Sequence, residues 1–140
     1  MAATLGSTRR ALVGLMGVSL AGTADVGQFL ATRTAMFTDA PGRAAGSVLG
    51  LLFWLALLAL AAGRYAGGER RGSRAATIGL AGLVAIGNVG LTAIHLKAGI
   101  GGWRPILGGG LGVAALIFGL LSLSHSLDPR SVTHRLTADK

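Results

Sequence analysis

The run "ALVGLMGVSLAGTADVGQFLA", residues 11–31, decides the class of this protein. It is dominated by apolar and small residues, and its length matches the ~20 residues that cross the hydrocarbon core of a bilayer as a helix. Yet it contains Asp25 and Gln28, which lie one helical turn apart. A carboxylate inside a membrane is costly unless it is paired or hydrated. The partner of Asp25 is therefore the central question that this sequence raises.

The whole chain has the composition of a membrane protein. It has 140 residues, of which 51% are hydrophobic and 13% charged, and its mean hydropathy is +0.64. A soluble domain carries about a quarter charged residues. Further apolar runs lie at about 47–64, 75–97 and 106–127. We therefore expect an all-α fold: a single domain over residues 1–140, an integral membrane four-helix bundle that is multi-pass in the cell membrane.

The charges predict an orientation for this bundle. The chain carries 13 Lys and Arg against 5 Asp and Glu. Nine of the 13 lie at the two termini and between the second and third runs, namely Arg9, Arg10, Arg64, Arg70, Arg71, Arg74, Arg130, Arg135 and Lys140. By the positive-inside rule, both termini are cytoplasmic. One alternative stays open, because "STRRALVGL" resembles a twin-arginine export signal whose cleavage would leave three spans.

Two function classes receive no support from the composition. Nucleic-acid binding is not expected, because no aromatic residues lie among the basic ones. The absence of cysteine excludes disulfides and thiol catalysis. We predict no metal site, because Asp25 and His95 would supply only two ligands, and no cofactor.

Polar residues form a stripe on two of the predicted helices. On the first span, Asp25, Gln28 and Thr32 follow helical spacing, as Asn88, Thr92 and His95 do on the third. Both spans run from the cytoplasm outwards, so the two stripes have the same depth. We expect them to face each other in the outer half of the bundle.

This pairing suggests a site for proton transfer. We assign catalytic roles to Asp25 and His95, with Asp25 donating or accepting a proton, and substrate-binding roles to Gln28, Asn88 and Thr92. The alternative is that the polar residues only hold the helices together, at perhaps ~0.6 kcal/mol each.

The other two spans differ in their small residues. The fourth span carries Gly108, Gly112, Ala115, Gly119, Ser122 and Ser126 along one face. This stripe predicts close packing against another helix, in this chain or in a neighbouring one. The second span is apolar on nearly all sides, and we expect its Phe53 and Trp54 to face lipid.

The third span, "GLVAIGNVGLTAIHLKAGI", resembles the corresponding helix of DoxX-like proteins, which are small four-helix bacterial membrane proteins. The likeness covers about 20 residues and concerns chiefly the architecture. It implies a role beside quinone or thiol redox chemistry.

Three functions remain open at this point. The first is binding or conversion of a small lipophilic molecule by proton transfer, as in an isomerase, cyclase or hydrolase. The second is a non-catalytic accessory or assembly subunit that contacts membrane lipid and either a partner membrane protein or further copies of itself. The third is a homo-oligomeric transporter or channel. A cavity around Asp25 would favour the first, a packed core the second, and a pore the third.

Overall fold

The computed structural model describes residues 2–67, 70–99 and 102–123 of the chain, and within these ranges every regular element is a helix. The helices are α1 (Ala2–Thr32), α2 (Met36–Asp39), α3 (Pro41–Gly67), α4 (Ser73–Lys97) and α5 (Arg104–Leu121). Four of them match the expected spans and begin up to nine residues earlier, whereas the short α2 is not expected from the sequence. The end of the predicted fourth span, residues 124–127, lies outside the described residues.

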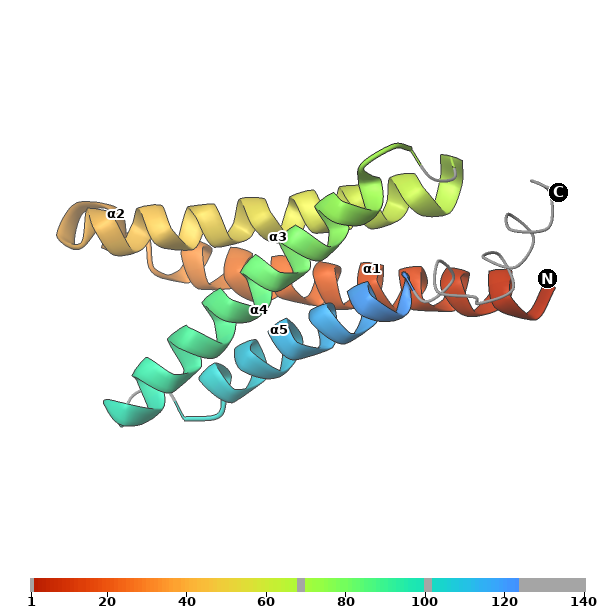
Figure 1. Cartoon of the computed structure of the whole chain (residues 1–140). Helices are drawn as coiled ribbons and strands as arrows, with labels where there is room; N and C mark the ends of the chain where they lie inside the picture. The colour runs from red at the N-terminus through yellow and green to blue at the C-terminus, as the bar shows by residue number, and fades with distance from the viewer. Residues whose placement is uncertain (1, 68–69, 100–101, 124–140) are drawn as a thin grey trace, which may run out of the picture.

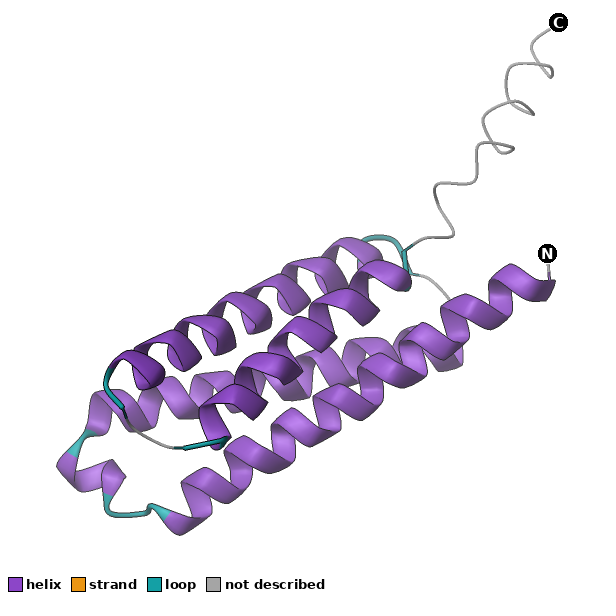
Figure 2. Ribbon diagram, turned by 90° about the horizontal axis from the view of Figure 1, so that it is seen from below, coloured by secondary structure: helices purple, strands orange, loops and turns teal. Residues whose placement is uncertain are grey.

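Each long helix packs on its neighbours in the chain, and the last packs on the first. The contacts join α1 to α3, α3 to α4, α4 to α5 and α5 back to α1, as Figures 1 and 2 show. This is the up-and-down order of an antiparallel bundle with short connections. Among the described residues, α1 and α4 are therefore diagonal to each other.

The core consists of apolar side chains from all four long helices. Leu15, Leu57 and Ala115 have no exposed surface, and Trp54 is only 2% exposed. The expectation that Trp54 faces lipid is therefore wrong. Its indole lies against Gly22 of α1, where a Cβ atom would collide with the ring. Because Gly22 has no side chain, there is space for the indole. The residue pattern of α3 alone does not reveal this space.

The glycines of α5 form a close seam with α4. A Cβ on Gly112 would lie 2.9 Å from the Cβ of Asn88 and 3.2 Å from the Cα of Ala85, and one on Gly119 would lie 3.1 Å from the Cβ of Ala81. The predicted close packing of this face is confirmed, and the neighbour is within the same chain. Ser126, at the end of the predicted stripe, lies outside the described residues.

The two ends of the bundle differ in how tightly they close. Figure 1 shows that α4 meets α3 near the connection between them and diverges from it toward α2. We call the end that holds the N-terminus and the α3–α4 connection the arginine-rich end, and the opposite one the α2 end.

Four helices are long and apolar enough to cross a membrane: Gly6–Thr32 within α1, and α3, α4 and α5 over their full lengths. Length and composition thus indicate a multi-pass membrane protein. Which side of the membrane holds the termini stays a prediction from the charges.

Candidate functional site

Asp25 forms an ion pair with an arginine that lies just before the predicted fourth span at 106–127. A side-chain nitrogen of Arg104, Nη2, donates to Oδ1 of Asp25 at 3.3 Å. Arg104 is the first residue of α5, so the pair joins α5 to α1. The side chains of Arg104 and Asp25 remain 39% and 30% exposed. The sequence led us to expect that Asp25 pairs with His95 and points at α4. Asp25 does neither.

The partner and the partial exposure of Asp25 bear on why an apolar helix tolerates a carboxylate. An opposite charge and access to water both reduce the cost of a carboxylate between apolar helices. Asp25 has both, because it is paired with Arg104 and its side chain is 30% exposed.

Asn88 and Thr92 of α4 lie against the glycines of α5. The amide of Asn88 donates to the carbonyl of Val84 at 2.8 Å, within its own helix. The hydroxyl of Thr92 lies within hydrogen-bonding distance of the carbonyl oxygens of Asn88 and Pro105. The contact with Pro105 joins α4 to the first turn of α5. Both residues thus serve the α4–α5 seam, beside Gly108 and Gly109.

His95 and Gln28 are separate from these contacts. Nδ1 of His95 lies 2.7 Å from the carbonyl oxygen of Leu91, one turn back in α4. Since a carbonyl can only accept, Nδ1 carries the proton in this contact. Gln28 is exposed on α1. Neither residue is placed against Asp25 by any contact among the described residues.

The five predicted site residues therefore do not form one constellation. Asp25 is at the α1–α5 contact, Asn88 and Thr92 are at the α4–α5 contact, and α5 lies between them. The predicted facing of the two stripes is wrong for a topological reason. Parallel helices in an up-and-down bundle are diagonal, and the first and third spans are parallel. Equal depth is then not sufficient for contact.

A second polar centre, which the sequence analysis missed, lies at the arginine-rich end. Arg64 belongs to α3 and is 5% exposed, although its position suggested a cytoplasmic loop. Its Nη1 donates to the hydroxyls of Thr77 at 3.2 Å and Ser122 at 3.0 Å, and its Nη2 donates to the carbonyl of Ser122 at 3.2 Å. One guanidinium thus holds α3 to α4 and to the end of α5.

The two hydroxyls around Arg64 are oriented by their own helices. Thr77 donates to the carbonyl of Ser73 and Ser122 donates to that of Gly119, both at 2.7 Å. Each hydroxyl oxygen can therefore present a lone pair to Arg64. Ser122 is the C-cap of α5, where a positive charge is favourable beside the last carbonyls. The signal in the sequence is an arginine at the end of one span and hydroxyl residues at the same level of two others.

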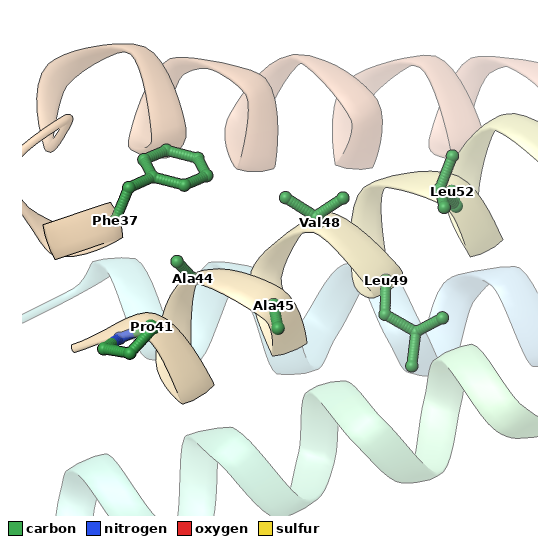
Figure 3. A pocket seen from close by; sticks show the side chains of 7 residues that line it. All are labelled: Phe37, Pro41, Ala44, Ala45, Val48, Leu49 and Leu52. Carbon is green, nitrogen blue, oxygen red and sulfur yellow. The ribbon is translucent and has the colours of Figure 1, made fainter.

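An apolar cavity of 390 Å³ lies at the α2 end, and no residue of either polar centre lines it. Figure 3 shows the side chains that line it, which are Phe37 of α2 and Pro41, Ala44, Ala45, Val48, Leu49 and Leu52 of α3. Phe37, Leu49 and Leu52 are each about half exposed, so the cavity is open to its surroundings. Its volume is within the range of small-molecule sites, but all of its lining residues are apolar.

The described residues contain no group of three His, Cys, Asp or Glu side chains that could hold a metal ion. Comparison of the chain with protein-family models, with curated protein sequences and with solved structures finds no match. The resemblance of the third span to DoxX-like proteins therefore stays a prediction.

Proposed function

We propose that this protein is a non-catalytic accessory or assembly subunit of a membrane complex. The observation that supports this most directly is the ion pair between Asp25 and Arg104. The Oδ1 atom of Asp25 accepts from a guanidinium of another helix, so the carboxylate joins α1 to α5 as a packing contact does. The other predicted site residues support the same interpretation, because Asn88 and Thr92 bond within α4 and across the α4–α5 seam.

The exposed surface is consistent with partners in the membrane. Only 22% of the most apolar window of each spanning helix is buried inside the chain. Large side chains such as Leu83, Ile86 and Ile94 of α4 are more than half exposed. Lipid, a partner membrane protein or a second copy of the chain can cover these faces. The glycine face of α5 is excluded as the docking surface, because α4 already occupies it.

Neutralising the ion pair separates this function from proton transfer. In Asp25→Asn with Arg104→Gln, the two side chains can still share a hydrogen bond, but neither can transfer a proton. We expect the double variant to restore the function of a strain that lacks the gene. On native gels in mild detergent, it should also enter the same complex as the wild-type chain. Loss of function with normal membrane levels and normal folding would favour proton transfer, and migration of the wild-type chain as a free monomer would contradict the assembly role.

A second candidate function rests on the cavity. An apolar cavity of 390 Å³ that opens at the protein surface suits a lipophilic molecule without a polar headgroup. Under this alternative, Ala45→Trp would fill the space and abolish binding of a tritiated isoprenoid or fatty-acid probe to the purified protein. Asp25→Asn would leave that binding unchanged, since Asp25 is not among the lining residues.

A further inference from the structure

Four exposed arginines from two separate elements lie at the arginine-rich end. Arg9 and Arg10 are on α1, and Arg70 and Arg71 precede α4. The guanidinium of Arg9 lies 5.4 Å from the ring centre of Tyr65 on α3. Figure 1 shows the start of α1 and the α3–α4 connection at the same end of the bundle. We call Arg9, Arg10, Arg70 and Arg71 the arginine collar.

Positive charge exceeds negative charge around the collar. The two acidic residues within the described ranges, Asp25 and Asp39, belong to the α2 end. In the sequence, Glu69 directly precedes Arg70 and is the acidic residue nearest to the four arginines along the chain. Positive charge is therefore in excess there, and an anion that binds to it relieves repulsion between like charges.

The position of the collar along the helices selects the kind of anion. Arg9 and Arg10 lie within one turn of Val13, which is 51% exposed and belongs to the apolar span. Tyr65 is 41% exposed beside Arg9, and tyrosine is enriched at the headgroup level of membranes. A guanidinium at this level is within reach of lipid phosphates, to which it can donate two parallel hydrogen bonds.

We propose that the arginine collar binds the headgroups of anionic phospholipids in the adjacent leaflet. This inference rests on insertion of the chain into a membrane but not on the assembly role. It does not extend to Arg104 of the α2 end, which is paired with Asp25.

The test is a lipid titration of the full chain purified in a neutral detergent. The midpoint of thermal unfolding is followed as short-chain phosphatidylglycerol is added, and phosphatidylcholine with the same acyl chains is the comparison. Each arginine near an anionic lipid surface strengthens association about fivefold. We therefore expect stabilisation by phosphatidylglycerol at concentrations where phosphatidylcholine has little effect. Arg70→Gln with Arg71→Gln should raise the concentration needed by about 25-fold.

Two matched variants separate binding from a general loss of charge or fold. Arg70→Lys with Arg71→Lys keeps the charge and should retain most of the response. Arg33→Gln with Arg43→Gln removes two exposed arginines of the α2 end and should change the response less than twofold. High salt should weaken the phosphatidylglycerol effect, because the collar is exposed to solvent.

Three results would overturn the proposal. The first is equal stabilisation by the two lipids, the second is an equal loss of response in the Arg33 and Arg43 variant, and the third is full stabilisation by inorganic phosphate alone. The third result would assign the collar to a soluble anion rather than to a lipid headgroup. Membrane fractionation of the wild-type chain tests the insertion on which lipid binding by the collar depends. Recovery of the chain in the soluble fraction would overturn the insertion and, with it, the lipid-binding proposal.

Discussion

The two ends of this bundle accommodate a charged side chain between helices in different ways. At the arginine-rich end, Arg64 is buried and bonded to α4 and α5, and the helices close around it. At the α2 end, Arg104 and Asp25 are paired but about a third exposed, and α4 diverges from α3. A buried charge requires several well-placed partners, whereas a partly exposed charge can be satisfied by one partner and water. We infer that the arginine-rich end holds the fold together and that the α2 end is its looser part.

Removing the buried arginine should have the largest effect. Arg64→Ala deletes a charged donor that bonds to Thr77 and Ser122, and it leaves a void at the meeting point of three helices. We expect a loss of about 3 kcal/mol in the free energy of unfolding. The measurement is denaturant unfolding in detergent micelles, followed by circular dichroism.

The control for that prediction is Arg104→Ala, which removes an arginine of the α2 end. Because this pair is partly exposed, its loss should cost about 1 kcal/mol or less. An equal cost for the two variants would remove the contrast between the ends. Arg64→Lys should fall between wild type and Arg64→Ala, because one ammonium cannot reproduce the fork of a guanidinium.

The α4–α5 seam provides the second prediction, since it runs between the two ends. Gly112→Ala would place a Cβ 3.2 Å from the Cα of Ala85 and 3.3 Å from the carbonyl oxygen of Val84, and these backbone atoms cannot move independently. We expect destabilisation by about 2 kcal/mol. Gly110→Ala, two residues away, meets nothing within 4 Å and should be neutral or slightly stabilising. If both variants unfold at the same denaturant concentration, the seam is not closely packed.

The sequence predicted the architecture well because it depends on averages over many residues. The apolar runs located all four long helices, and the glycine spacing on α5 identified a tightly packed face. The starting residues were less accurate. The run at 11–31 is only part of α1, because the helix continues to Ala2 through residues that have no apolar signal.

The candidate site was predicted less well because it depends on which helices are neighbours. Matching depths placed Asp25 opposite Asn88, but the order of the bundle puts α5 beside α1 and leaves α4 diagonal. Arg104 was overlooked because Trp103 and Pro105 flank it and give it the context of a loop, whereas Pro105 in fact lies in the first turn of α5. Arg64 was overlooked because positive residues at span ends are usually exposed.

The smallest effect is expected from the ion pair itself. In a double-mutant cycle of Asp25→Asn and Arg104→Gln, the two single variants should each lose less than about 1 kcal/mol, with a coupling of about 0.5 kcal/mol between them. The same cycle for Asp25→Asn and His95→Gln should give a coupling near zero, because no contact joins these residues. A clear coupling with His95 would revive the predicted proton-transfer pair.

The central claim is that Asp25 faces Arg104 of α5 and not the polar stripe of α4. The chain contains no cysteine, so thiols can be introduced in pairs without background. Cysteines at positions 25 and 104 should be joined by a short bismaleimide in native membranes. When a protease then cuts the chain between the two positions, the joined fragments should migrate together on a denaturing gel, whereas unjoined fragments separate. Cysteines at 25 and 88 should remain unjoined under the same conditions. Efficient joining of 25 to 88, with little or none of 25 to 104, would contradict the account.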